Sequence, residues 1–539
     1  GLPLDSPICP GKLAPFIFPG RIFVTHCLRL CSNGCFFVAS RKFFVSSGAM
    51  EYEAVIGLEV HVQIKTKSKL FSKCPYRFGE PPNTLTDQVV LGLPGTLPVI
   101  NGEAVLKTIR AGIIFGCDIA EMAKWDRKNY FYPDCPKNYQ ISQNTDPICR
   151  NGYVEIELLG PSRNVMGEHK RIALDRIHLE EDVGKLTHFE SDSGIDFNRA
   201  GVPLMEIVSN PDMRSAEEAF AYLNSLRMHM VYADISNCDM EKGEMRCDAN
   251  VSVRPIGSKT LGTKVEIKNL NSVSGVKNGI EHEIKRQIQT LRDGGRVYQE
   301  TRRWNADTNS TTVMRTKETA FDYRYFADPD LMPVRISQET KAAIMSEIPE
   351  LPFAKQERFF RHYDLPYTIT SVICTKKTLS DFFETVVAIH NNPRAIANII
   401  ANDLLRELSN VDQSSGKKLD PGEIDGCKIS PQALAELVKL TDDGVISKQI
   451  AQGVFIEMFR TGKSANEIVR EQGLRQNANH DELLTLCQNA IERNEKAAQE
   501  FRGGKDSAIN AIKGFVMKET RGQANPTMVD KTLRELLKP

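Results

Sequence analysis

The sequence predicts an α+β protein, with a large, mainly antiparallel sheet domain, then a helical domain, and a small all-α tail domain at the C-terminus. Two observations on the spacing of apolar residues support this prediction. Up to about residue 330, several segments alternate apolar and polar residues with a period of two, which is typical of half-buried strands. Beyond that point apolar residues recur at helical spacing, and a polar stretch at 409–426 interrupts them.

Residues 1–49 differ in composition from the rest of the chain. They hold five basic residues and a single acid, and the first methionine is Met50. This composition fits a transit peptide or upstream sequence that is not native to the protein, with a structured arm as a third alternative. We treat 1–49 as an N-terminal extension and leave it out of the fold prediction.

The predicted sheet domain covers residues 51–330. Its first strand, "IGLEVHVQIKT" at 56–66, places apolar residues on one face and Glu59, His61 and Gln63 on the other. The same alternation occurs in "RIHLEED" (176–182), "CDANVSVRP" (247–255) and "KVEIKN" (264–269). Helices are predicted between the strands at 214–230 and 272–292, which together indicate an α+β domain.

The remainder of the chain is predicted to be helical. Its parts are a helical domain at 331–408, a linker at 409–427 and a helical tail domain at 428–539. Asn392–Pro393 separates two helices in the first part. Ser430 before Pro431 marks a helix start in the last part, and Ser464 with Glu467 forms a capping box there.

The bulk composition excludes several classes of protein. Lys and Arg together number 69, as do Asp and Glu, so a surface for nucleic acid must be local. The 13 cysteines form no C-x-x-C pair, which argues against a disulfide framework. No apolar run approaches the length of a membrane span, so we predict no membrane partner.

Acidic residues on strands give the strongest functional signal. Glu206, in "AGVPLMEIVSNP" (200–211), lies on an otherwise apolar strand face, where a carboxylate is costly unless it is paired or binds a metal. Taken alone, Glu206 is more simply a structural ion pair. Further acids on other predicted strands favour a hard divalent cation among them: Glu59, Glu180, Glu181, Asp182 and Asp248.

Carboxylate oxygens favour Mg²⁺, which proteins usually hold with one or two carboxylates together with substrate phosphates. His61 fits Mg²⁺ less well because imidazole prefers softer metals. It is either a hydrogen-bond donor to a phosphate oxygen or a structural strand histidine.

The segment "WDRKNYFYPDCPKNYQISQ" (125–143) gives the second signal. Its cations are interleaved with aromatic rings, a combination that suits phosphates and flat bases. The predicted nucleotide- or substrate-binding residues in it are Arg127, Lys128, Tyr130, Tyr132 and Lys137. Beside an acidic metal site they suggest a nucleotide or an RNA 3′ end. The alternative is a solvated basic loop.

Common catalytic motifs are missing from the sequence. It contains no G-x-x-x-x-G-K-[ST] and no G-x-G-x-x-G, so any ATP is bound without the usual phosphate loops. It also lacks G-x-S-x-G and H-E-x-x-H, and no particular nucleophile stands out.

Several blocks together resemble one family. The chain resembles the B-type subunits of aspartyl/glutamyl-tRNA(Asn/Gln) amidotransferases, the GatB/GatE family, over roughly 51–539. The blocks that carry the resemblance are "VIGLEVHVQ", "WDRKNYFYPD", "HLEEDVGK", "IDFNRAGVPLMEIVSNP", "RCDANVSVRP", "KVEIKNLNS", "DYRYFADPDL" and "GFVMKETRGQANPTMV".

The resemblance implies a cradle-shaped catalytic domain, a helical domain and a tail domain that binds tRNA. It implies that ATP and Mg²⁺ phosphorylate the side-chain carboxylate of glutamate misacylated onto tRNA(Gln), and that ammonia then displaces phosphate. Asp-tRNA(Asn) is a further expected substrate. The implied partners, in a heterotrimer, are the A-type subunit, a glutaminase that makes ammonia from glutamine, and the C-type subunit.

The resemblance also implies which residues act. The catalytic positions fall on Glu59, His61, Glu181, Glu206 and Asp248, with Glu180 adjacent. The predicted Mg²⁺ ligands are Glu59, Glu181, Glu206 and Asp248, and Arg199 joins the substrate-binding set. The predicted tRNA contacts in the tail are Lys505, Lys513, Lys518 and Arg521, with a solvated helical face as the alternative.

Zinc is not expected. Some members carry several cysteines around the segment matching 71–95, whereas this chain has only Cys74 there, and one thiolate cannot form a tetrahedral site. Two other functions compete, a non-catalytic tRNA-binding scaffold and a metal-dependent hydrolase of small molecules. We expect a bacterial cytoplasmic protein, or a mitochondrial or plastid one if 1–49 is a transit peptide.

Overall fold

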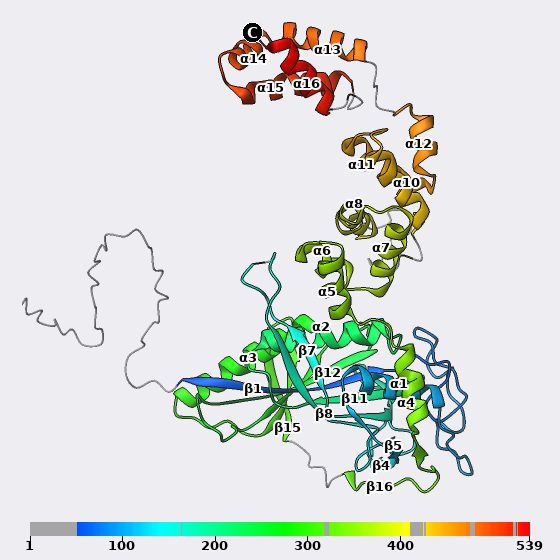
Figure 1. The fold of residues 1–539 in the computed structure, drawn as a ribbon. Helices are drawn as coiled ribbons and strands as arrows, with labels where there is room; N and C mark the ends of the chain where they lie inside the picture. The colour runs from blue at the N-terminus through cyan, green and yellow to red at the C-terminus, as the bar shows by residue number, and fades with distance from the viewer. Residues whose placement is uncertain are drawn as a thin grey trace, which may run out of the picture. The chain divides into compact units, whose positions relative to one another are not determined.

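The computed structural model describes residues 51–162, 164–316, 323–409, 424, 427–474, 480–520, 524 and 526–538. The predicted extension at 1–49 lies outside the described residues. The described chain is α+β, as predicted from the sequence (Figure 1).

Within the part of the chain that the structure describes, the strands lie before residue 336. They are β1 (Tyr52–Gln63), β2 (Asp118–Ile119), β3 (Met122–Ala123), β4 (Asp126–Asn129), β5 (Tyr139–Ser142), β6 (Cys149–Arg150), β7 (Tyr153–Glu157), β8 (His169–Glu181), β9 (Lys185–His188), β10 (Ser193–Asp196), β11 (Pro203–Ser209), β12 (Met245–Pro255), β13 (Val265–Leu270), β14 (Glu300–Asn305), β15 (Ser310–Thr316), β16 (Phe326–Ala327) and β17 (Val334–Arg335).

Ten of these strands form one sheet in the order β15-β14-β13-β12-β1-β11-β8-β6-β2, with β7 paired to β8 beside this path. The pairs are antiparallel except for β13 with β14. Strands β16, β4 and β5 form a separate small sheet. The long strand β1 lies between β11 and β12, so residues from distant parts of the sequence meet across it.

The helices in the first part of the chain are α1 (Gly102–Ile114), α2 (Ala216–Tyr232), α3 (Val273–Arg292) and α4 (Gln338–Glu347). The predictions at 214–230 and 272–292 are confirmed by α2 and α3, whose first turns are capped by Ser215 and Ser272. The next helices are α5 (Pro352–His362), α6 (Tyr367–Ile373), α7 (Lys377–Ile389), α8 (Pro393–Asn398), the π-helix η2 (Ile399–Leu404) and α9 (Leu405–Ser409).

The helices after the predicted linker are α10 (Pro431–Asp442), α11 (Lys448–Thr461), α12 (Ala465–Glu471), α13 (His480–Arg493), α14 (Glu495–Arg502), the short 3₁₀ turn η4 (Asp506–Ala508), α15 (Ile509–Glu519) and α16 (Pro526–Leu537). The predicted starts are confirmed, since Ser430 caps α10 and Ser464 forms a capping box with Glu467 at α12. No helix among the described residues is both long and apolar enough to cross a membrane.

Three large hydrophobic cores organise these elements, and a small fourth cluster of Cys74, Leu85, Val90 and Ala200 lies apart from them among the described residues. The first joins the apolar face of the sheet to α1, α2 and α3 and extends to Ile344 of α4, beyond the predicted boundary at 330. The second runs from Phe359 to Val469 and therefore contains residues from both sides of the predicted linker at 409–427. The third lies within α13–α16. The domain boundaries themselves stay predictions.

The sheet orients the candidate residues of β1. Leu58, Val60 and Val62 are fully buried in the first core. Because successive strand residues point to opposite faces, Glu59 and His61 point to the face away from that core. The functional site is built on this second face.

Candidate functional site

A row of charged residues crosses four neighbouring strands of the large sheet. His61 of β1 lies opposite Arg246 of β12 on one side and opposite Glu206 of β11 on the other. Glu206 in turn lies opposite His178 of β8. Directly opposed residues of antiparallel strands project to the same face, so the register gathers these four side chains in one place.

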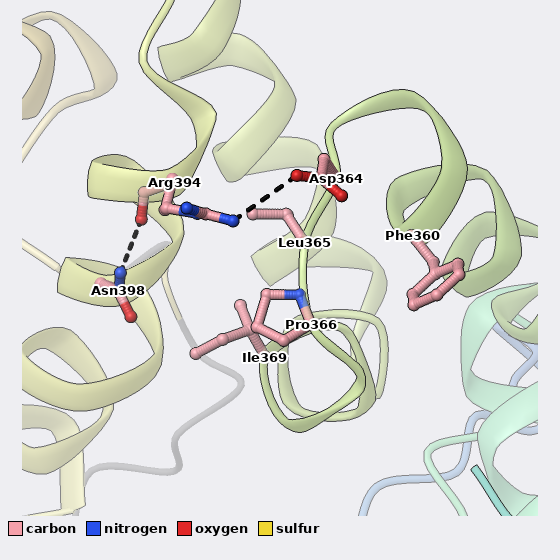
Figure 2. A pocket seen from close by; sticks show the side chains of 7 residues that line it. All are labelled: Phe360, Asp364, Leu365, Pro366, Ile369, Arg394 and Asn398. Atoms are coloured by element: carbon pink, nitrogen blue, oxygen red, sulfur yellow. Dashed lines mark hydrogen bonds and ion pairs between the residues drawn. The ribbon is translucent and has the colours of Figure 1, made fainter. Parts of the chain in front are cut away.

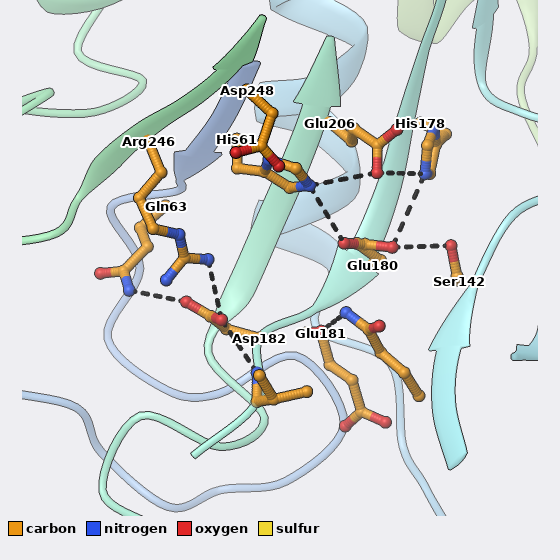
Figure 3. Close-up of polar contacts among 12 residues, drawn as sticks. His61, Gln63, Ser142, His178, Glu180, Glu181, Asp182, Glu206, Arg246 and Asp248 are labelled. Carbon is orange, nitrogen blue, oxygen red and sulfur yellow. Dashed lines mark hydrogen bonds and ion pairs between the residues drawn. The ribbon is translucent and has the colours of Figure 1, made fainter. Parts of the chain in front are cut away.

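Two carboxylates and two imidazoles form the centre of this row (Figure 3). His61 Nε2 lies 3.2 Å from Glu206 Oε2 and 4.0 Å from Glu180 Oε1. His178 Nε2 lies 3.5 Å from Glu206 Oε2 and 3.6 Å from Glu180 Oε2. Ser142 Oγ donates a hydrogen bond of 2.9 Å to Glu180 Oε2. We call His61, His178, Glu180 and Glu206 the carboxylate–histidine cluster.

The cluster holds both carboxylates in their ionised form. Burial alone would raise the pKa of Glu206, but His178 and the hydrogen bond from His61 lower it well below its usual range. Burial opposes ionisation of Glu180 too, yet Lys128 and His178 lower the pKa of that carboxyl. Burial would lower the pKa of His61, but the hydrogen bond with Glu206 and the charges of Glu206 and Glu180 together outweigh burial and raise this pKa.

Lys128, predicted to bind substrate, lies close to the same cluster. Burial would lower the pKa of its ammonium group, but Glu180, Tyr325 and Glu206 raise it. Its Nζ lies 5.1 Å from the centre of the Tyr323 ring. Among the described residues no carboxylate comes within ion-pair distance of Nζ, so this cation remains available to an anionic substrate.

Glu181 occupies a different environment from Glu180. The sequence predicts Glu181 among the metal ligands, but its carboxylate bonds the Lys137 ammonium and accepts a hydrogen bond of 2.9 Å from the Ile141 N–H. Figure 3 shows it pointing away from Glu180. Consecutive strand residues face opposite sides, so the structure brings Glu180, rather than Glu181, into the cluster.

Glu59 and Asp248, the other two predicted ligands, are opposite each other on β1 and β12. Asn250 Nδ2 donates a hydrogen bond of 2.8 Å to Glu59 Oε1. Lys268 bonds the Asp248 carboxylate and lies 3.4 Å from Glu266. Both acids share the face of His61, but each has its own polar partner beside the cluster.

Asp182 forms a second buried polar group next to the cluster. It accepts hydrogen bonds of 2.9 Å from Arg246 and from Gln63. Burial would raise the pKa of Asp182, but Arg246 and Arg199 lower it. Arg199, predicted to bind substrate, donates to the carbonyls of Val183 and Gly184 at 2.9 and 2.7 Å, so in this structure it holds the loop after β8.

The remaining predicted substrate residues lie on or near the small β16-β4-β5 sheet. Arg127 bonds Asp328 at 2.9 Å and Asp330 at 2.8 Å. Tyr130 and Tyr132 stack with ring centres 5.7 Å apart. Arg127 is therefore already paired, and the rings that lie against its guanidinium are those of Tyr139 and Phe326.

Comparison with known proteins decides the family. Residues 54–342, more than half of the chain, match the family model described as "GatB/GatE catalytic domain", and residues 381–537 match the one described as "GatB domain". The chain belongs to the GatB/GatE family. The carboxylate–histidine cluster lies within the part that matches the catalytic domain of this family.

Several bacterial relatives match over nearly their full length. A protein of Opitutus terrae is 57% identical over 491 residues, which is 90% of this chain and 99% of that protein. Proteins of Thermoanaerobacter pseudethanolicus and Brevibacillus brevis are 49% and 46% identical, over 90% of this chain and 100% and 99% of their own lengths. Each is named as the B-type subunit of an aspartyl/glutamyl-tRNA(Asn/Gln) amidotransferase.

The donor atoms of the carboxylate–histidine cluster suit some metals better than others. Within the described residues, His61, Glu180 and Glu206 offer ligand atoms that all lie within 4.8 Å of one another. The two carboxylates fit Mg²⁺, whereas the imidazole fits it less well. Glu180 and Glu206 are therefore the residues that could hold Mg²⁺, with His61 as the hydrogen-bond partner of Glu206.

Sequence reasoning missed His178, Arg246 and Ser142. The alternation of the strands could have identified two of them. His178 is two residues before Glu180 and Arg246 is two residues before Asp248, so each lies on the same strand face as a predicted site residue. Ser142 ends β5 in a different sheet, and its hydrogen bond to Glu180 depends on tertiary packing.

Three of the four tail residues predicted to contact tRNA, Lys505, Lys513 and Lys518, are described by the structure and lie in α15 or in the turn before it. Lys505 bonds Glu500 at 2.9 Å, and Lys513 lies 3.4 Å from Asp530. Lys518 is exposed near the end of α15. Arg521 lies outside the described residues.

Proposed function

We propose that this chain carries out the ATP-dependent activation and amidation of misacylated tRNA as the B-type subunit of an aspartyl/glutamyl-tRNA(Asn/Gln) amidotransferase. The substrates are Glu-tRNA(Gln) and Asp-tRNA(Asn), ATP, and ammonia. Membership of the GatB/GatE family supports the reaction. The carboxylate–histidine cluster is the observation that supports this part of the chain as the place of the phosphoryl-transfer step.

The reaction has two steps. A carboxylate oxygen of the amino acid attacks the γ-phosphorus of ATP, and ADP leaves. The nitrogen of ammonia then attacks the carbonyl carbon of the acyl phosphate, phosphate leaves, and a proton is lost from the nitrogen. Phosphoryl transfer requires positioning and charge neutralisation rather than a protein nucleophile, which agrees with the absence of a nucleophile motif.

The residues of the site match these needs. Glu180 and Glu206, held ionised, would bind Mg²⁺, which supplies charge neutralisation for the transferring phosphoryl group. Lys128 places an ammonium group beside them to attract the substrate carboxylate or a phosphate oxygen. His61 fixes the orientation of Glu206 through its Nε2 and holds a proton there.

The proposal includes partners that the chain itself does not contain. The A-type subunit, a glutaminase, would supply ammonia from glutamine, and the C-type subunit would complete a heterotrimer. The names of the relatives support a multi-subunit enzyme that acts on tRNA.

Measuring ATP cleavage distinguishes the proposed catalytic function from that of a non-catalytic tRNA-binding scaffold. The chain, purified with its partner subunits, should release phosphate from ATP with Glu-tRNA(Gln), but not with uncharged tRNA(Gln) or without tRNA. Glu180→Gln should abolish that release while tRNA binding persists. If Glu180→Gln releases phosphate at the normal rate, the cluster has a structural role and the scaffold function is favoured.

A further inference from the structure

An open cavity lies in the second core region, far in sequence from the carboxylate–histidine cluster. It has a volume of about 420 Å³ and lies between the turn that joins α5 to α6 and helix α8 (Figure 2). Its lining combines apolar and polar side chains: Phe360, Asp364, Leu365, Pro366, Ile369, Arg394 and Asn398. A cavity of this size and mixed lining suits a small planar ligand.

The backbone on both sides of the cavity is unusual. Asp364 has φ of +50°, in the left-handed region that residues other than glycine rarely adopt. The π-helix Ile399–Leu404 begins directly after Asn398. Single-turn π-helices and strained residues are frequent at functional sites, because the surrounding fold must hold them in place.

The charged groups of the cavity are poorly satisfied by the protein itself. Arg394 and Asp364 approach within 3.5 Å, and their side chains are 71% and 99% exposed. An ion pair of this kind contributes little to stability. Beside it, Leu365 is buried and Phe360 is half exposed, so a charged rim adjoins an apolar floor.

We propose that this cavity binds one unpaired guanine nucleotide of the RNA substrate. This proposal rests on the proposed function, since it assumes that tRNA is the substrate. Unstacked bases of RNA are recognised by stacking on aromatic or apolar surfaces and by hydrogen bonds to their exposed edges. Here Pro366 and Ile369 supply the surface, and the charged rim supplies the hydrogen bonds.

Guanine satisfies both charges at once. The Arg394 guanidinium can donate two hydrogen bonds to guanine O6 and N7, the commonest specific contact of arginine with a base. The adjacent guanine N1–H and N2–H groups can then donate to the two oxygens of Asp364. Adenine offers arginine only N7, and pyrimidines lack the paired acceptors, so each leaves part of the rim unpaired.

Kethoxal, which reacts with N1 and N2 of unpaired guanine, tests the base directly. In the complete enzyme bound to Glu-tRNA(Gln), one unpaired guanine should be protected. Asp364→Asn should restore its reactivity, because asparagine tolerates the left-handed backbone but presents N–H groups to the N–H donors of guanine. Unchanged protection in Asp364→Asn, or protection of an adenine at N1 from dimethyl sulfate instead, would overturn the proposal.

A matched pair of variants tests the charge. Arg394→Gln should weaken binding of Glu-tRNA(Gln) about tenfold. Arg361→Gln removes an equally exposed arginine on α5 that pairs with Glu357 outside the cavity, and should change binding less than twofold. If both variants lose the same affinity for tRNA, the effect of Arg394 is only the general attraction of a positive charge for RNA phosphates, and the proposal is overturned.

Two further outcomes are informative. If Arg394→Gln binds tRNA normally but no longer assembles with the partner subunits, the cavity is a protein contact and the proposal is wrong. If the unmodified enzyme shows no tRNA-dependent ATP cleavage, the proposed function fails. A wild-type enzyme that is active and a cavity variant that binds tRNA normally would overturn only this inference.

Discussion

The carboxylate side chains of the carboxylate–histidine cluster in the sheet domain are buried, whereas Lys505 and Glu500 in the tail unit of α13–α16 are exposed. Glu180 and Glu206 are 2% and 8% exposed, and each lies close to Lys128 and to the ring of His178. In the tail, Lys505 and its partner Glu500 are 64% and 40% exposed. Buried ions depend on exact partners, while exposed pairs contribute little, so the same substitution should have very different effects in the two regions.

Glu206→Gln should have the largest effect. The change keeps the shape of the side chain but removes the charge that faces His61 and His178. We expect tRNA-dependent ATP cleavage to fall by about a hundredfold or more. Phosphate release with Glu-tRNA(Gln) measures it.

A matched control is Glu53→Gln, also on β1, where Glu53 pairs with Arg254 away from the cluster. It should retain activity. Normal turnover in Glu206→Gln would remove Glu206 from the site. Failure of that variant to fold would favour the structural ion pair.

Removal of metal should be equally severe. Two carboxylates of the cluster suit Mg²⁺, so the metal-stripped enzyme should lose ATP cleavage and regain it with Mg²⁺. Elemental analysis should find no stoichiometric zinc, because Cys74 is the single cysteine between 71 and 95. Tightly bound zinc in the washed protein would contradict this interpretation of the segment.

Lys69 is a buried lysine of the sheet domain, and it can be compared with the exposed lysines of the tail unit. Its side chain is fully buried, and its Nζ donates to the carbonyls of Leu85 and Phe197 at 2.7 and 3.4 Å. Burial lowers the pKa of Lys69 to about 8 from its ordinary value of 10.5. Between these values the unfolded chain binds more protons than the folded one, so the stability of the sheet domain should rise with pH.

The effect is measured against Lys69→Met, which cannot titrate. From pH 7.5 to pH 10, wild type should gain on the order of 2–3 kcal/mol relative to the variant. Trp125 and Trp304 are the chain's two tryptophans and are both buried in the first core, so their fluorescence in urea reports this domain alone. Parallel pH profiles for the two proteins would show that Lys69 titrates normally.

Much of the fold could be predicted from sequence because local pattern decides it. The alternation at 56–66, the caps at Ser430 and Ser464, and the helices α2 and α3 each depend on neighbours in the sequence. The cores could not be predicted this way. The second core joins helices on both sides of 409–427. Such packing depends on contacts between residues far apart in the sequence, which the spacing of neighbouring residues does not predict.

In the site, too, local sequence patterns predict some features, whereas others depend on tertiary packing. Strand patterns and the family resemblance predict Glu206, His61 and Glu180 as candidates, and the structure brings them together. The resemblance places Glu181 among the ligands, although alternation puts it on the opposite face from Glu180. Ser142 reaches Glu180 only through the tertiary structure.

Removing the tail unit should affect tRNA more than chemistry. A cut after Leu474 deletes the third core as a whole and keeps the second, which ends at Val469. A cut at the predicted boundary of 428 would instead remove part of the second core, and so confuse unfolding with lost binding. We expect the KM for tRNA to rise about tenfold or more.

Glutamine hydrolysis by the glutaminase partner, measured without tRNA, should change little in the truncated enzyme. The lost affinity should be the salt-sensitive part, because phosphate contacts release counterions. If the truncated chain binds Glu-tRNA(Gln) as tightly as the full chain across a salt series, the tail does not bind tRNA.

Single lysines in the tail should give the smallest effects, and their order follows from their partners. Lys505 must give up its bond with Glu500 before it can contact a phosphate, whereas no described acid lies within ion-pair distance of the exposed Lys518. Lys518→Gln should therefore weaken tRNA binding two- to threefold and lower the salt dependence by about one phosphate contact. Lys505→Gln should change both by less, since the ion pair already offsets its charge. Binding titrations of the two variants over a range of salt concentrations decide between them. A larger loss in Lys505→Gln would mean that tRNA displaces Glu500, and that exposed pairs in the tail are exchanged for phosphate on binding.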